Sequence, residues 1–74
     1  MALMKVLQDR QTLLYFKSIG SWRRDLKDAF VFETEEEAER FALDQGFANV
    51  QIVDITSTRT IVNVRPLAGG PPPA

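Results

Sequence analysis

One segment of this chain has the pattern of an α-helix, and the segments around it favour β-strands. In TEEEAERFALDQGF (residues 34–47), Thr34 stands three residues before Glu37, which is the spacing of a capping box. Gly46 follows the last periodic residue, where a left-handed C-cap is expected. The apolar face of this predicted helix consists of Ala38, Phe41 and Ala42. A chain with one short helix has to bury that helix against a sheet.

The acidic run at the start of this segment has a structural and a functional interpretation. Carboxylates in the first turn of a helix are favoured by the helix dipole by ~0.3–1 kcal/mol each. Glu36 also stands four residues before Arg40, a favourable spacing for an ion pair. The functional alternative is that the same carboxylates form a contact surface for a partner. We expect a helix start with a solvated outer face.

The rest of the ordered chain is rich in β-branched and aromatic residues. The predicted strands are residues 4–8, 12–18, 22–25, 49–56 and 60–65. The order β-β-β-α-β-β predicts an α+β domain, with a mostly antiparallel sheet of four or five strands and one helix packed on one face. We expect this single domain to span residues 1–66. Residues 67–74, LAGGPPPA, are expected to form a flexible Gly/Pro-rich tail, because they contain no core residue beyond Leu67. The alternative is a proline-recognition ligand, but its PxxP spacing is missing.

The composition argues against catalysis. The 74 residues include no cysteine and no histidine, so thiolate metal sites, disulfides and the commonest general base are absent. The aspartates have no metal-binding spacing, and Gly69–Gly70 precedes proline rather than a phosphate-binding helix. We therefore expect no enzyme: no catalytic residues, no metal, no cofactor and no small-molecule substrate.

The charge and hydropathy suggest where the protein acts. The net charge of −1 gives no overall attraction to nucleic acid or to an anionic membrane. The sequence has neither the apolar region of a signal peptide nor a run long enough to span a bilayer. A cytoplasmic location without a membrane partner is the expectation.

The central block, residues 13–53, carries the pattern Y-x-K…W…A…F-x-T-x-x-E-A…A…G. The positions that carry it, with Asp25 and Phe41 among them, are Tyr15, Lys17, Trp22, Asp25, Ala29, Phe32, Thr34, Glu37, Ala38, Phe41, Ala42 and Gly46. This block resembles small uncharacterised bacterial and phage-type domains of unknown function, which fold as a β-hairpin followed by a helix and further strands. The resemblance implies that fold and a bacterial setting. It implies no activity and no catalytic residues.

Several predicted strands do not alternate between apolar and polar residues. Residues 13–16, LLYF, place two apolar side chains on each face of a strand, and residues 52–55 and 61–64 behave similarly. One short helix cannot cover both faces of such a sheet, so we expect an exposed apolar face that is buried in a homodimer or against a protein partner. The alternative is a strongly curled sheet that buries both faces within one chain. The candidate self-association residues are Leu14, Phe16, Val53, Ile55 and Val62.

A basic and aromatic cluster around the second turn suggests a different function. Cations interleaved with aromatic residues on strands are typical of sheets that stack nucleic-acid bases. The alternative is that the single tryptophan belongs to the core and the cations surround its edge. The candidate nucleic-acid residues are Lys17, Trp22, Arg23, Arg24 and Lys27.

Overall fold

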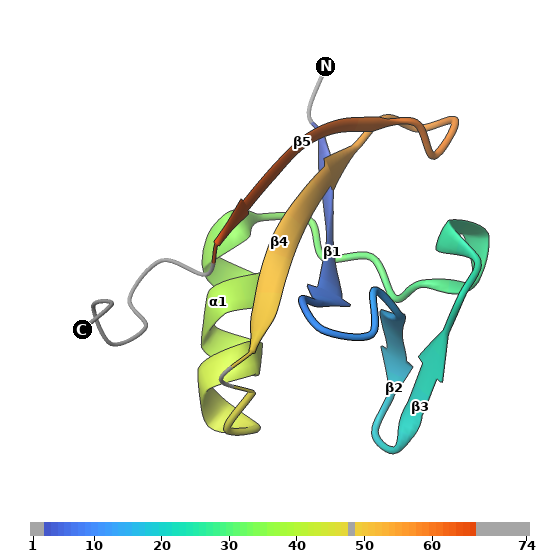
Figure 1. The fold of residues 1–74 in the computed structure, drawn as a ribbon. Helices are drawn as coiled ribbons and strands as arrows, with labels where there is room; N and C mark the ends of the chain where they lie inside the picture. The colour runs from blue at the N-terminus through green and yellow to red at the C-terminus, as the bar shows by residue number, and fades with distance from the viewer. Residues whose placement is uncertain (1–2, 48, 67–74) are drawn as a thin grey trace.

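The computed structural model describes residues 3–47 and 49–66 as one five-stranded sheet with a single α-helix (Figure 1). The elements are β1 (Met4–Asp9), β2 (Tyr15–Ser18), β3 (Ser21–Arg23), the 3-10 helix η1 (Leu26–Asp28), α1 (Glu35–Asp44), β4 (Val50–Ile55) and β5 (Ile61–Pro66). All neighbouring strands are antiparallel, in the order β3-β2-β1-β4-β5. The predicted α+β fold with the order β-β-β-α-β-β is confirmed. The prediction for the tail concerns residues 67–74, which lie outside the described residues.

The two ends of α1 follow the local signals in the sequence. The Thr34 hydroxyl accepts a hydrogen bond from the Glu37 backbone N–H at 3.2 Å, which satisfies one of the free donors of the first turn. At the other end, Gly46 has a φ of +74°, and the Phe47 N–H donates to the Ala42 carbonyl at 2.9 Å. This left-handed glycine with a backward hydrogen bond is a Schellman-type C-cap.

The helix packs on β1 and β4 through its small residues. Ala38 and Ala42 are fully buried, and their short side chains let the helix approach the sheet closely. The face of the sheet that α1 covers is called the helix face here. Its buried cluster contains Leu7, Phe16, Phe32, Ala38, Ala42, Val50 and Ile52, with Trp22, Phe41 and Phe47 packed at its border.

A segment without regular structure fills a gap between β1 and β2. These two strands share a single paired position and then diverge. Residues 29–32 enter the gap: Phe32 exchanges two backbone hydrogen bonds with Lys5, at 2.7 and 2.9 Å, and the Phe30 N–H donates to the Phe16 carbonyl at 2.8 Å. The segment is therefore held from both sides and extends the core across the sheet.

The opposite face of the sheet is also covered by the chain itself. Its buried cluster contains Val6, Tyr15, Ala29, Val53 and Ile55, with Met4, Leu26 and Val31 packed against it. In Figure 1, α1 and η1 lie on opposite sides of β1 and β4. The Arg59 guanidinium, from the β4–β5 turn, donates to the carbonyls of Leu26 and Ala29 at 3.1 and 3.3 Å. These bonds hold the η1 segment over the opposite face, so the chain itself buries apolar residues on both faces of β1 and β4.

The predicted second strand is too long at its beginning. Residues 12–14 form a loop, in which Leu13 has a φ of +64°. The Asp9 carboxylate accepts the backbone N–H groups of Gln11 and Thr12 at 2.7 and 2.9 Å, and these bonds hold the pKa of Asp9 below its usual value. This aspartate turn, rather than strand propensity, sets the backbone up to Tyr15.

Candidate binding surfaces

Within the described residues, β5 is an edge strand that pairs only with β4. The backbone groups of Lys5 bond to the segment before α1, so they point away from β4. Lys5 and Asp54 are therefore a pair without mutual hydrogen bonds. The N–H and C=O of Asp54 consequently point away from β1 and toward Asn63 on β5. Along a strand, successive residues direct their N–H and C=O groups to opposite sides. Asn63 directs these groups to β4, so Val64, the next residue, directs its N–H and C=O away from the sheet. Pro66 has the same outward direction, which explains why a residue without an N–H is tolerated there.

The side chains of β5 are as open as its backbone. Ile61, Val62 and Val64 are 46%, 54% and 43% exposed, and Asn63 is exposed as well. The β4–β5 register shifts between the positions opposite Asp54 and Ile55, which makes Val62 the extra residue of a bulge. We call Ile61, Val62, Asn63 and Val64 the β5 edge.

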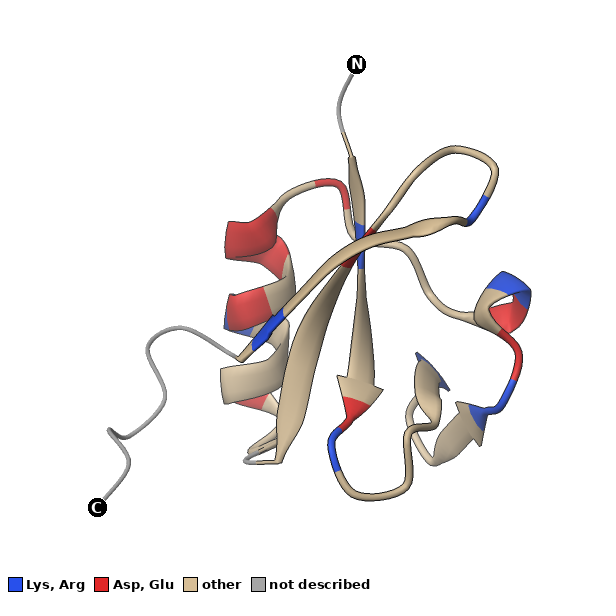
Figure 2. Cartoon of the chain, turned by 45° about the horizontal axis from the view of Figure 1, so that its top comes forward, with Lys and Arg blue, Asp and Glu red and all other residues tan. Residues whose placement is uncertain are grey.

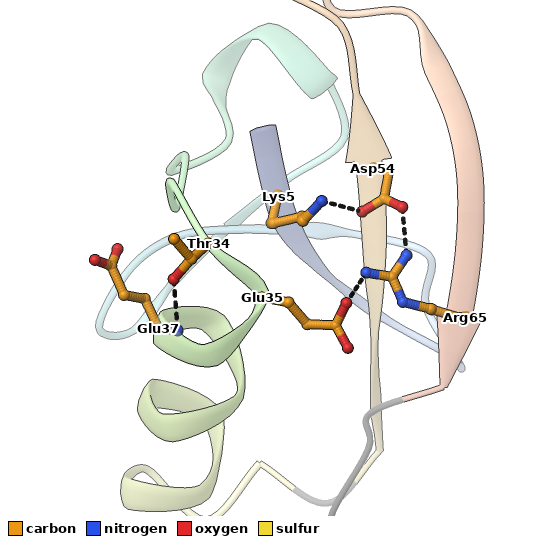
Figure 3. A network of polar contacts seen from close by, with 6 residues as sticks. All are labelled: Lys5, Thr34, Glu35, Glu37, Asp54 and Arg65. Carbon is orange, nitrogen blue, oxygen red and sulfur yellow. Dashed lines mark hydrogen bonds and ion pairs between the residues drawn. The ribbon is translucent and has the colours of Figure 1, made fainter. Parts of the chain in front are cut away.

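The one cation of β5 is directed inward, to the helix face. The Arg65 guanidinium donates to the carboxylates of Asp54 on β4 and Glu35 on α1, and Lys5 Nζ lies 3.1 Å from Asp54 (Figure 3). Burial alone would raise the pKa of Asp54, but the hydrogen bonds and charges of Arg65 and Lys5 outweigh it and hold that pKa below its usual value. The same hydrogen bonds, which Arg65 donates to Asp54 and Glu35, raise the pKa of Arg65. This network ties β5 to the helix and leaves the β5 edge without a charge.

A second open surface lies between α1 and the end of β2. It is a groove of about 800 Å³. Ile19 and four phenylalanine rings form its apolar lining. The rings form a closed cycle: Phe16 contacts Phe41 and Phe30, and Phe32 also contacts both, with centroids 4.9–6.3 Å apart. Phe30 is 50% exposed, while Phe16 and Phe32 are buried. We call this surface the aromatic groove.

The two walls of the aromatic groove carry different charges. The α1 wall presents Glu36, Glu37 and Asp44 beside Arg40, and the β2 wall presents Lys17. The predicted ion pair between Glu36 and Arg40 is not among the ion pairs of residues 3–47 and 49–66. Figure 2 shows the acidic residues gathered along α1. The acidic run thus starts the helix, as expected, and also borders a groove.

Four of the five predicted self-association residues do not lie on an open face. Phe16 is buried on the helix face, and Val53 and Ile55 are fully buried on the opposite face. Leu14 is half-buried in the loop before β2. Phe16 packs with α1, and the η1 segment covers Val53 and Ile55, so the predicted open face is wrong for these three residues. Val62 is the one that remains exposed.

The predicted nucleic-acid residues lie at the β2–β3–η1 end of the molecule. Four of them are exposed cations: Lys17, Arg23, Arg24 and Lys27. The fifth, Trp22, is half-buried, with its ring edge-on to Phe16 and Phe47 at 5.5 and 5.4 Å. Asp25 and Asp28 lie among the cations along the chain. The tryptophan is engaged with the core, so any base stacking at this end would have to proceed without its full ring face.

The lining of the aromatic groove holds two hydroxyls, and that of Thr34 already accepts the helix-cap hydrogen bond. In the part of the chain that the structure describes, no three acidic side chains converge as a metal ion would require. What the two surfaces offer is an unpaired strand and an apolar groove, which are features of binding sites.

The sequence analysis missed Val64, Ile61 and Phe30 as surface residues. Pro66 was the available signal for the first two, because proline inside a strand pattern indicates an edge strand. No local signal marks Phe30, whose exposure depends on how residues 29–32 enter the sheet.

Among the described residues, no helix is long and apolar enough to cross a membrane. Comparisons with protein-family models, with curated proteins and with solved structures found no match to this chain. The resemblance of residues 13–53 to small bacterial and phage-type domains therefore stays a prediction.

Proposed function

We propose that this chain is a small non-enzymatic assembly module of the cytoplasm, which forms a homodimer by pairing the β5 edges of two copies. The observation that carries the proposal is the outward direction of the Val64 backbone, beside three exposed apolar side chains. An exposed edge of this kind accepts a further strand readily.

Natural proteins usually protect such edges with charges, prolines or bulges. β5 has a bulge at Val62 and a proline at position 66, which restrict pairing to a short region around Val64. The charge of Arg65 is held on the helix face by Asp54 and Glu35, so it does not repel a second strand. The part of β5 that can pair with another strand is thus short, but no charge or proline blocks pairing at Val64.

Antiparallel pairing of two β5 strands has the two-fold symmetry of most homodimers. With Val64 at the axis, its N–H and C=O meet those of Val64 in the second copy. The two five-stranded sheets then join into one continuous sheet, in which the Val64 side chains of the two copies lie next to each other as a cross-strand pair.

Size-exclusion chromatography with light scattering, over about 0.01–1 mM protein, tests this function. The wild type is expected to reach the mass of a dimer. Val64→Lys is expected to remain a monomer, because two-fold pairing brings its charge next to the same charge of the second copy. Leu13→Lys adds the same charge at an exposed loop residue away from β5 and should still dimerise. A monomeric wild type over the whole range contradicts the proposal.

The alternative function is nucleic-acid binding by the exposed cations at the β2–β3–η1 end. It is favoured by the position of the cations of β3 and η1 on the side of the sheet away from the acidic helix, as Figure 2 shows. Fluorescence anisotropy with a labelled single-stranded oligonucleotide tests it, with Arg23→Glu/Arg24→Glu as the variant. Binding that weakens in this variant and with rising salt supports this alternative.

A further inference from the structure

The aromatic groove exists because α1 covers only part of the helix face. The helix packs over β1 and β4, while β2 diverges from β1 and residues 29–32 fill the gap between them. Phe30 therefore reaches the surface half-exposed, between the end of β2 and the helix. The β5 edge lies at the other edge of the sheet, so a ligand in the groove leaves β5 accessible.

The lining of the groove selects the part of a ligand that can enter it. Phe16, Phe30, Phe32 and Phe41 have no polar side-chain atoms, so they offer no hydrogen bond to a polar group. An apolar side chain that enters gains contact with several rings at once and removes the exposed half of Phe30 from water. The groove thus fits a large aliphatic or aromatic side chain.

The charges of the α1 wall select what flanks that side chain. Glu36, Glu37 and Asp44 border the groove, and none of them joins an ion pair of the described residues. Arg40 offsets one of these three charges, which leaves this wall acidic, while Lys17 lies on the opposite wall. A cation next to the apolar side chain would complement it.

We propose that the aromatic groove binds a peptide segment of a partner protein, in which a large apolar side chain lies next to a basic residue. The apolar side chain inserts between Phe30 and Phe41, and the basic residue lies against Glu36 and Glu37 in the first turn of α1. The site is separate from the β5 edge, so a dimer presents two such grooves.

NMR titration of the ¹⁵N-labelled protein tests the proposal with three synthetic probes. The first is the cationic peptide acetyl-Arg-Leu-Trp-Arg-amide, the second its charge-reversed form acetyl-Glu-Leu-Trp-Glu-amide, and the third acetyl-Arg-Gly-Ser-Arg-amide, which lacks the apolar side chains. The first peptide should shift the amides of the groove residues and approach saturation at about 1 mM. The other two should bind at least about tenfold more weakly, because one meets like charges and the other has nothing to insert.

Two variants locate the binding on the protein. Phe30→Ala should weaken binding of the cationic peptide about tenfold, and its thermal unfolding shows whether the fold is kept. Leu43→Ala removes an equally exposed apolar side chain that is on α1 but outside the groove, and should leave binding unchanged. Val64→Lys should bind the peptide normally even as a monomer, so failure of dimerisation and failure of peptide binding are distinguishable.

Three results would overturn the proposal. They are equal binding of all three peptides, the absence of groove shifts at about 5 mM peptide, and shifts of the groove amides that follow protein concentration without peptide. The last would identify a second copy of this chain, rather than a partner peptide, as the occupant.

Discussion

Val64 and Val53 lie opposite each other in the β4–β5 ladder, yet Val53 is fully buried and Val64 is 43% exposed. The contrast arises because β4 has neighbours on both sides and the η1 segment packs over it, whereas β5 ends the sheet. Within the described residues, one side of β5 pairs with β4, and the other side, toward which the Val64 backbone points, has no partner strand. The proposed dimer depends on this difference.

The first prediction concerns the carboxylate that links β1, β4 and β5. Asp54→Asn leaves Arg65 and Lys5 with a neutral partner in a site where the Asp54 side chain is 7% exposed. We expect a loss of about 2–3 kcal/mol in the free energy of unfolding, measured by urea denaturation. Asp28→Asn, on the exposed η1, is the matched control and should change stability by less than about 0.5 kcal/mol. Equal stability of the two variants would contradict this role of Asp54.

The second prediction is the pH dependence of the same contribution. The pKa of Asp54 is lower in the folded chain than the unfolded value of about 3.9. Its stabilisation is therefore fully present above that unfolded value and is lost as the pH falls through the lower, folded pKa. The stability difference between wild type and Asp54→Asn should be constant from about pH 5 to 8 and should shrink below about pH 4. Asp9, whose pKa is also lowered, is present in both proteins and cancels in this comparison.

The third prediction concerns the cover of the opposite face. Arg59→Ala removes both hydrogen bonds to the η1 segment and should reduce the free energy of unfolding by about 1–3 kcal/mol. Arg59 has a φ of +64°, so Arg59→Gly loses the same bonds but relieves backbone strain. The glycine variant should be more stable than the alanine variant by about 1 kcal/mol. If both unfold at the wild-type urea concentration, Arg59 does not hold η1 in place.

The parts of the fold that depend on neighbouring residues could be predicted from the sequence. Thr34 and Gly46 mark the ends of α1 because caps involve only the adjacent turn. The order of strands along the chain was also predicted correctly, because β-rich runs are a property of adjacent residues. The loop before β2 was missed because the Asp9 turn competes with the strand propensity of Leu13 and Leu14.

The surfaces could be predicted only in part, because exposure depends on contacts between distant residues. Val53 and Val62 look alike in the sequence, and only the position of β5 at the end of the sheet separates them. Likewise, the cover over Val53 and Ile55 comes from residues 26–31, which are held there by Arg59. No periodicity within a strand encodes such a contact.

Hydrogen exchange at the Val64 amide, measured by NMR at two protein concentrations, tests the proposed dimer most directly. The Arg65 amide, which faces Ile52 and bonds to β4, is the internal reference and should exchange slowly at both concentrations. At about 1 mM protein, the Val64 amide should also exchange slowly, because it bonds to the second copy, and at about 20 µM it should exchange rapidly. Rapid exchange of the Val64 amide at both concentrations, with Arg65 protected, would contradict pairing through β5.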